Sequence, residues 1–387
     1  MISMKIGIVT HWMAVDNYGG MLQSYALQRY LRNLGHDAYL IRFYIDKKNQ
    51  QSFSVKIKSV LKALLISLNV FPNAKKIKRE NRITQERVKI RRFDEFRNKY
   101  IALSPKVYNS IYEIKNDPPE ADIYITGSDQ VWAGDLNNPN IWIFYLDFGG
   151  ENIKRISYAA SFGFSYFPGK NEEKFKELLS SFSAISVREA NGIDICKKYG
   201  FDATRCVDST FLLNKEQYIS IMSPRKHNKA YAFFYTVNVS TPDEIYWNEL
   251  SEYLCSLGKK CVITTGSGYR RAEELFYKAV YDYATVEEWL SNIFYSDVVI
   301  TSSFHGIAFS LILNKDFIYL PLKGTAGAGN NRIVDLLSLV GLETRQANSI
   351  EDVKRLLNEK IDYNHINCQK YQQLITQSKA YLDVFLG

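Results

Sequence analysis

The sequence predicts an α/β protein of two doubly wound domains, each a parallel sheet with helices on both faces. Short apolar segments alternate with segments of helical periodicity, which is the pattern of parallel sheets. They form two sets, separated near 215–228. With 387 residues, 46% of them hydrophobic, the chain has enough apolar surface for two cores. We therefore expect domains at 1–214 and 229–387, with a basic helical insertion at about 47–106 in the first.

The first set opens with a strand–helix–strand unit at residues 4–43. Lys5–Thr10 is a short apolar strand, and the helix after the loop Asp16–Gly20 carries apolar residues near 3.6 spacing. The next strand is Ala38–Phe43. Further short apolar strands are expected at Asp122–Thr126, Arg155–Ala160, Ala184–Arg188 and Thr204–Asp208.

The second set has the same alternation. Two capping boxes, Thr241–Glu244 and Thr285–Glu288, mark helix starts, the first with a proline at its first helical position. Helices near 332–340 and 350–358 end the chain. Strands are expected at Tyr231–Val237, Cys261–Thr265, Asp297–Thr301 and Asp316–Leu320.

The insertion at 47–106 carries most of the positive charge. The chain has a formal net charge of +8, and this segment alone holds 17 Lys and Arg against four acidic residues. Within it, Phe53–Val70 has the pattern of an amphipathic helix with lysines on its polar face. The segment is either a solvated helical insertion or a dock for an anionic membrane surface. We expect no nucleic-acid partner, because the basic run lacks a recognisable binding fold.

The remaining composition indicates a cytoplasmic protein without a bound cofactor. The five cysteines show no CxxC pair, the N-terminus reads as a strand, and no apolar run approaches ~20 residues. There is no GxGxxG signature, and Arg42 stands where an NAD site would have an acid. The five histidines lack metal-ligand spacing, so we expect no metal site.

Polar residues cluster where the predicted strands end. Ligands of open α/β sheets bind at the carboxyl ends of the strands, so a cleft between the two domains would gather these groups around one small anion. The strand ends are Thr10–His11, Gly127–Gln130, Ser161, Arg188–Glu189, Asp208, Thr264–Ser267 and Thr301–His305.

The turn Thr301–Gly306 is the strongest candidate for chemistry. A strand that ends in a polar turn and opens a helix presents free backbone N–H groups to an anion. His305 in that turn is able to exchange a proton near neutral pH. Simpler interpretations stay open. His305 would then only hydrogen-bond to backbone at a helix start, Arg188 would form a salt bridge with Glu189, and Asp129 would cap the helix or turn that follows it.

Six ordered motifs resemble the polysaccharide pyruvyl transferase family, over residues 4 to about 342. Each is weak alone, but their order is specific. They are Asn17-Tyr18-Gly19-Gly20, Gly127-Ser128-Asp129-Gln130-Val131-Trp132, Ser157-Tyr158-Ala159-Ala160-Ser161-Phe162-Gly163, Ser186-Val187-Arg188-Glu189, Val207-Asp208-Ser209-Thr210 and Ser303-Phe304-His305-Gly306.

The resemblance implies a glycosyltransferase-B-like pair of Rossmann-like domains. It implies transfer of an enolpyruvyl unit from phosphoenolpyruvate (PEP), as co-substrate, onto two hydroxyls of a sugar in a surface or exopolysaccharide precursor. It places the donor-site histidine at His305 and the donor-site arginine at Arg188. We expect the catalytic residues to be His305 and Asp129. The donor-binding residues are then Arg188, Ser303, Gly306, Arg332 and Lys323, and the acceptor-binding residues are His11, Asp16, Asn17, Gly19 and Gly20.

One position departs from the family pattern. Relatives carry an arginine two residues before the histidine, whereas this chain has Ser303. Either another cation replaces it, with Arg332 and Lys323 as candidates, or the donor differs. The alternatives are a glycosyltransferase that uses a nucleotide sugar and a non-catalytic carbohydrate-binding relative. Glu343 and Glu351 have the eight-residue spacing of retaining glycosyltransferases, but they follow no glycine-rich donor loop.

The acceptor is expected to be a sugar or a lipid-linked oligosaccharide. In the lipid-linked case the basic segment 47–106 would hold the protein at the anionic inner face of the cell membrane.

Overall fold

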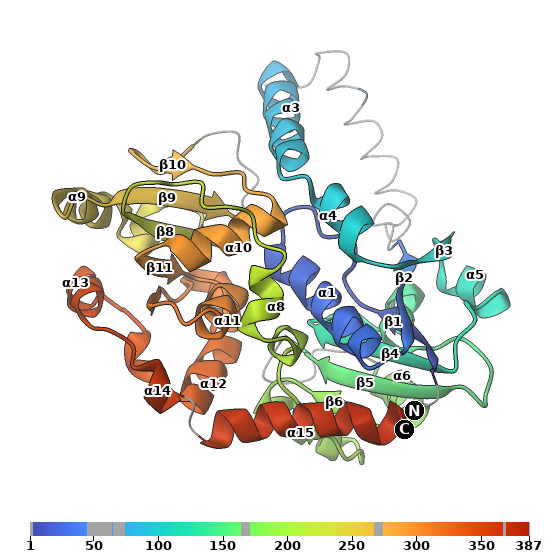
Figure 1. Cartoon of the computed structure of the whole chain (residues 1–387). Helices are drawn as coiled ribbons and strands as arrows, with labels where there is room; N and C mark the ends of the chain where they lie inside the picture. Colours follow the sequence, from blue (N-terminus) through green and yellow to red (C-terminus); the bar gives the residue numbers. More distant parts are fainter. Residues whose placement is uncertain are drawn as a thin grey trace.

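The structure, a computed structural model, contains two parallel sheets that lie side by side (Figure 1). It describes residues 3–44, 64, 74–163, 171–266, 274–366 and 369–386. The N-terminal half is built on the strands β1–β7 and the C-terminal half on β8–β12. The α/β class is confirmed, while the predicted division at 214 and 229 stays a prediction.

The first sheet has seven strands in the order β3-β2-β1-β4-β5-β6-β7, all parallel. The order reverses at β1, between β2 and β4, and such a switch point is where ligands bind in sheets of this kind. The strands are β1 (Lys5–Val9), β2 (Asp37–Phe43), β3 (Leu103–Tyr108), β4 (Ile123–Asp129), β5 (Lys154–Ala160), β6 (Ser186–Val187) and β7 (Thr204–Arg205).

The second sheet has five parallel strands in the order β10-β9-β8-β11-β12, with its reversal between β8 and β11. Its central strands are apolar runs because helices cover both faces. The strands are β8 (Tyr231–Thr236), β9 (Lys260–Thr265), β10 (Val280–Tyr281), β11 (Val298–Thr301) and β12 (Phe317–Tyr319).

Helices alternate with these strands. In the N-terminal half they are α1 (Tyr18–Asn33), α3 (Ala74–Ile90), α4 (Phe93–Tyr100), α5 (Ile111–Asn116), α6 (Glu172–Ser180) and α7 (Ala190–Lys198). The later ones are α8 (Lys215–Ile219), α9 (Trp247–Ser256), α10 (Val286–Tyr295), α11 (Phe304–Ile312), α12 (Asn331–Val340), α13 (Ile350–Asn358), α14 (Tyr363–Ile366) and α15 (Gln369–Leu386).

Both predicted capping boxes are present. Thr285 caps α10, as the sequence indicates. Thr241 and Glu244 form their box around a short 3-10 turn, Pro242–Ile245, and α9 begins after it at Trp247.

The basic segment is only partly helical, which corrects one expectation. Its described part forms α3 and α4, but Leu103–Tyr108 is strand β3 at the edge of the first sheet. Leu103 pairs in register with Leu40 of β2, so a neighbouring strand decides the conformation there. The predicted amphipathic helix Phe53–Val70 lies outside the described residues, apart from Leu64.

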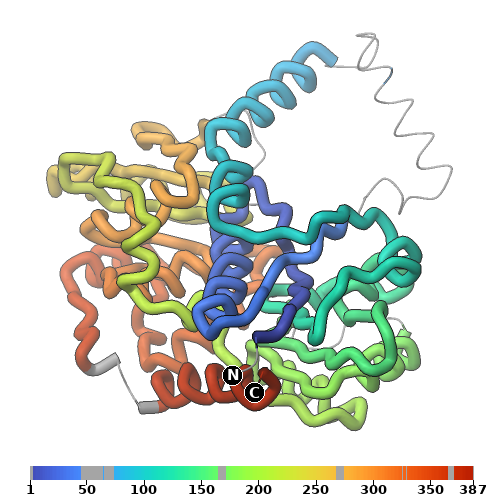
Figure 2. The backbone as a smooth tube through the Cα atoms, turned by 45° about the vertical axis from the view of Figure 1, so that its right-hand side comes forward, coloured from blue at the N-terminus to red at the C-terminus, as the bar shows by residue number. Residues whose placement is uncertain are grey.

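The last helix follows the second set of strands in the chain. In the structure, α15 runs along the N-terminal half (Figure 1). The Tyr381 hydroxyl donates to the Ser157 carbonyl in β5 at 2.9 Å, and the Val207 N–H donates to Ser378 Oγ at 2.9 Å. The two ends of the chain therefore lie close together (Figure 2).

One buried apolar cluster joins the two sheets. It contains Ile6 and Ile8 of β1 together with Phe233 of β8 and Trp289 of α10. At its centre, the ring of Tyr18 stacks on Trp289 with ring centroids 5.3 Å apart. The two halves thus share a core, which brings the carboxyl ends of their strands together. Across the described ranges, no helix is long and apolar enough to cross a membrane.

Candidate active site

The first turns of two helices meet between the sheets. His305 lies in the first turn of α11, directly after β11, and Gly19 lies in the first turn of α1, after β1. A Cβ atom on Gly19 would stand 2.1 Å from Cγ and Nδ1 of the His305 ring. Only glycine permits this approach, so the imidazole rests on the backbone of the opposite half.

Short polar residues shape the turn that carries His305. The Thr301 hydroxyl donates to the Tyr235 carbonyl of β8 at 2.7 Å and accepts the Ser303 N–H at 3.1 Å. Ser303 is the N-cap of α11 and its Oγ accepts the Gly306 N–H at 3.5 Å. A Cβ on Gly306 would lie 2.3 Å from Thr301 Oγ1, so glycine is required here too. These contacts fix where the histidine points.

Arg188 is the central cation of the site. Its guanidinium donates from Nε to Glu189 at 2.7 Å and from Nη1 to Asp208 at 2.8 Å, and Nη1 lies 3.5 Å from Asp129. The guanidinium carbon lies 4.5 Å from the centroid of the Phe304 ring in the C-terminal half. Burial lowers the pKa of Arg188, but the three carboxylates outweigh it and hold the pKa above its usual value.

Asp208 connects the cation to the histidine. Its Oδ2 accepts from Arg188 and from Ser128 Oγ at 2.9 Å and lies 3.7 Å from His305 Nε2, while Oδ1 accepts the Thr210 N–H at 3.0 Å. Burial by itself would raise the pKa of Asp208. The imidazole of His305, 3.7 Å away, and the charge of Arg188 instead hold that pKa well below its usual range. Asp208 is therefore an ionised carboxylate.

A second arginine reaches the same cluster from α12. Arg332 lines a small cavity together with Arg188, Asp208 and Phe304. Burial lowers the pKa of Arg332, and the neighbouring charge of Arg188 lowers it further. Two guanidinium groups that disfavour each other's charge are stabilised when an anion binds between them.

Several buried donors in this cluster lack an acceptor. Within the described part of the chain, Nη2 of Arg188, Nε2 of His305 and Nε of Arg332 make no hydrogen bond. Buried polar groups are nearly always paired, so donors left without a hydrogen bond at one place indicate a ligand that accepts hydrogen bonds. Arg188 and Arg332 border a cavity of ≈ 20 Å³, about enough for one water molecule.

Comparison with known proteins decides the family. The sequence model described as polysaccharide pyruvyl transferase matches residues 17–323, which is most of the chain. The chain belongs to the polysaccharide pyruvyl transferase family. Among curated protein sequences, none matches it.

One solved structure supports the fold. The UDP-GlcNAc 2-epimerase from Methanocaldococcus jannaschii shares 12% identity over 99% of this chain and 100% of that chain, with a TM-score of 0.51. MurG from Acinetobacter baumannii shares 9% identity over 98% of each chain, with a TM-score of 0.41. The predicted glycosyltransferase-B-like architecture of two Rossmann-like halves is thus confirmed.

The donor-side residues predicted for this family member fall in two places. Ser303 and Gly306 flank His305 in the α11 turn, and Arg332 joins Arg188 at the cavity. Lys323 is different, because it is exposed and its Nζ lies 4.7 Å from the centroid of the Tyr246 ring. Of the two cations expected to replace the missing arginine, Arg332 is the one beside Arg188.

Asp129 ends β4 beside Arg188. Its φ of 71° lies in the left-handed region, which few residues other than glycine adopt. Burial would raise the pKa of Asp129, but the charges of His305 and Arg188 lower it. A carboxylate with a lowered pKa is a weak proton acceptor, so this environment favours an orienting role.

The acceptor-side residues surround the start of α1. Asn17 is the N-cap of that helix, and its side-chain oxygen accepts the Gly20 N–H at 2.9 Å. Asp16 precedes it and borders a larger cavity. His11 is exposed, with Nε2 3.3 Å from the Gln130 carbonyl and its ring centroid 5.0 Å from that of Phe144.

The sequence places Asp208 at a strand end but does not assign it a role. Its position in the motif Val207-Asp208-Ser209-Thr210 was the one feature that pointed to the site. In the part of the chain that the structure describes, no group of three or more His, Cys, Asp or Glu side chains is arranged to hold a metal ion.

Proposed function

We propose that this protein transfers the pyruvyl unit of PEP onto two hydroxyls of a sugar, forming a pyruvate ketal. The observation that carries the proposal is the buried group of unpaired donors on Arg188, Arg332 and His305 at the meeting point of the two halves. PEP carries two oxyanions, a carboxylate and a phosphate, and a carbon that must be protonated. Two arginines and one histidine match these requirements.

The reaction balances without a redox cofactor. A proton adds to C3 of PEP, which becomes a methyl group, and C2 becomes an oxocarbenium-like electrophile. One sugar hydroxyl adds to C2 and loses its proton, and the C2–O bond to phosphate breaks. The second hydroxyl then adds to C2 and loses its proton, and inorganic phosphate leaves with one of the released protons.

His305 is the proposed acid that protonates C3. A positioned histidine contributes typically 10²–10⁴-fold to such a step. Arg188 and Arg332 bind the carboxylate and the phosphate, and the N–H groups at the start of α11 assist. The lowered pKa of Asp129 makes it a poor base, so Asp16, which borders an open cavity, is the better candidate to accept the hydroxyl proton.

The closed cluster has to open before PEP enters, because ≈ 20 Å³ does not accommodate a ten-atom anion. The proposal therefore includes separation of the halves along the contact between Gly19 and His305, followed by closure on the bound donor.

Calorimetric titration of the full chain with PEP, and in parallel with UDP- and GDP-sugars, tests the proposal. PEP is expected to bind, and Arg188→Lys to weaken that binding. His305→Ala is expected to bind PEP but to lose ketal formation by about 10²-fold or more. Arg355→Lys, an exposed arginine on α13, is the control. Binding of a nucleotide sugar without binding of PEP would overturn the proposal and favour a glycosyltransferase.

A further inference from the structure

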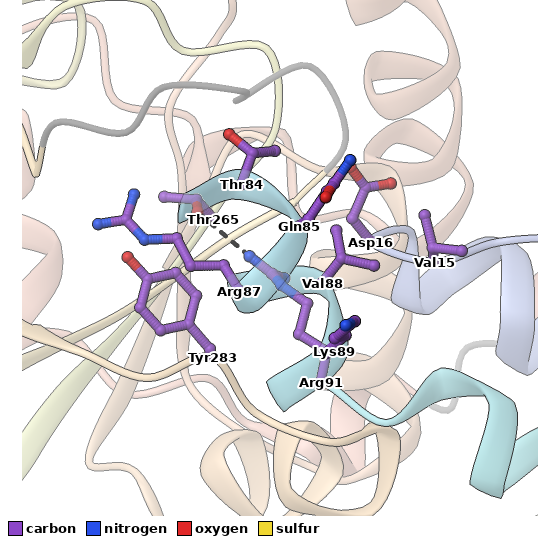
Figure 3. Close-up of a pocket in the computed structure, with 10 residues that line it drawn as sticks. All are labelled: Val15, Asp16, Thr84, Gln85, Arg87, Val88, Lys89, Arg91, Thr265 and Tyr283. Carbon is purple, nitrogen blue, oxygen red and sulfur yellow. Dashed lines mark hydrogen bonds between the residues drawn. The ribbon is translucent and has the colours of Figure 1, made fainter. Parts of the chain in front are cut away.

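A second and larger cavity opens between the halves, with a volume of ≈ 420 Å³ (Figure 3). It does not share a lining residue with the cavity at Arg188. Its walls include Asp16 before α1, Arg87 and Lys89 of α3, Arg91 after α3, and Thr265 and Tyr283 of the C-terminal half.

The cavity lining is strongly basic. Arg87, Lys89 and Arg91 border it, against the single carboxylate of Asp16. Arg87 lies over the Tyr283 ring at 4.9 Å (Figure 3). It also pairs with Glu274 at 3.3 Å. The described part of the basic segment therefore turns several of its cations toward a cavity that both halves line.

Arg91 is the most informative of these cations. It is only 4% exposed, and its Nη1 donates to the Tyr18 hydroxyl at 3.0 Å and its Nη2 to Thr265 Oγ1 at 3.5 Å. No carboxylate among the described residues pairs with it. Its guanidinium carbon lies 5.6 Å from the centroid of the Tyr18 ring and 5.5 Å from that of Tyr283, so aromatic rings and not a carboxylate contact this charge, and an anionic ligand would supply the counter-ion.

The cavity lies within reach of His305. Thr265 ends β9, and β9 is two strands from β11, whose end leads to His305. Neighbouring strands are about 4.8 Å apart, so the two strand ends are separated by roughly 10 Å. Asp16 borders the cavity and Gly19, three residues later, contacts His305. A sugar with an attached anionic group spans such a distance.

We infer that this cavity binds the diphosphate of a diphosphate-linked sugar acceptor, held by Arg91 and Arg87. The Thr265 hydroxyl is a further donor. Arginine forks bind phosphate oxygens in pairs, which fits two guanidinium groups facing one cavity. The inference rests on the proposed function, because it assigns the anionic part of that reaction's acceptor.

Titration calorimetry with inorganic pyrophosphate, on the full chain and without PEP, tests the inference. The wild-type protein is expected to bind, and Arg87→Gln to weaken binding by about tenfold or more. Arg91→Gln is expected to do the same, with circular dichroism checking its fold because Arg91 is buried. Arg355→Gln is the matched control and is expected to leave pyrophosphate affinity unchanged, because Arg355 is exposed on α13 and does not line this cavity.

The outcomes separate the two proposals. Absence of pyrophosphate binding, or binding that changes with Arg188→Lys but not with Arg87→Gln, would overturn the inference and leave the PEP proposal standing. Pyrophosphate binding that depends on Arg87, in a protein that does not bind PEP, would support the diphosphate site and refute the proposed function. Parallel titrations with UDP and with farnesyl diphosphate then show whether a nucleotide or a prenyl group carries the diphosphate.

Discussion

The Gly19 backbone and the His305 ring are in direct contact across the two halves of the molecule. A Cβ on Gly19 would overlap the imidazole at 2.1 Å. Glycine is therefore needed here for space, and not for a left-handed backbone conformation. The requirement is the close approach itself, so the contact couples closure of the halves to the position of the proposed acid.

Gly19→Ala is expected to abolish closure and reduce transfer by about 10²-fold or more, since small displacements of a catalytic group have effects of this size. Steady-state transfer rates would measure it. Gly150→Ala is the control, because a Cβ there meets no atom within 4 Å. A Gly19→Ala protein with wild-type rates would show that the contact plays no part in the reaction.

Arg188→Lys keeps the charge but removes the fork that reaches Glu189 and Asp208 together. We expect PEP affinity and transfer each to fall by about tenfold or more, since hydrogen bonds to charged groups contribute about 1.5–3 kcal/mol. Titration with PEP and rate measurement check this. Equal losses in Arg355→Lys would mean that the effect is not specific to the site.

Tyr18→Phe is expected to lower the free energy of unfolding by about 1–3 kcal/mol. Its hydroxyl donates to the Ala284 carbonyl at 2.6 Å and accepts from Arg91 Nη1 at 3.0 Å, so the change leaves buried partners without hydrogen bonds. Burial raises the pKa of Tyr18 to about 12, so the neutral hydroxyl makes these bonds at all ordinary pH values. Urea unfolding measures the loss, and Tyr112→Phe, at an exposed position, should show none.

Asp282 gives the C-terminal half a pH dependence of known sign. Burial would raise the pKa of Asp282, but hydrogen bonds from His227, Lys226 and Asn292 outweigh it and lower the pKa to about 2. Because the folded-state pKa is depressed, the stabilisation is complete above the unfolded value near 3.8 and is lost as pH falls toward 2. It amounts to about 2 kcal/mol at neutral pH.

Urea unfolding of wild type and Asp282→Asn between pH 7 and pH 2 tests this. The difference between the two proteins should be constant from pH 7 to about pH 5 and shrink below pH 4. A difference that grows as the pH falls would contradict the assigned direction.

The basic segment 47–106 is still proposed to associate with anionic membranes. Each lost cation should weaken binding to phosphatidylglycerol vesicles by ~1 kcal/mol, about fivefold. Lys75→Glu with Arg79→Glu, both exposed on α3, tests this against Lys197→Glu with Lys198→Glu on α7. Vesicle sedimentation at low and high salt is the measurement, and salt-insensitive or absent binding would refute the proposal.

The sequence predicted the central strands of both sheets and the edge strands β7 and β12, but it missed the edge strands β3 and β10. β3 and β10 are half-exposed or short, and their pairing partners, rather than an apolar run, make them strands. The sequence also did not indicate where α15 packs. An amphipathic helix shows which of its faces is apolar, but not which sheet that face covers.

By itself, the sequence determined the α/β class, the polar strand ends and the family, because local periodicity and motif order are encoded in short segments. Only the tertiary structure decided that Asp208 joins Arg188 to His305, that Arg332 and not Lys323 stands beside them, and that Gly19 supports the imidazole. These are contacts between residues far apart in the chain. They depend on how two sheets share one core, which no local pattern specifies.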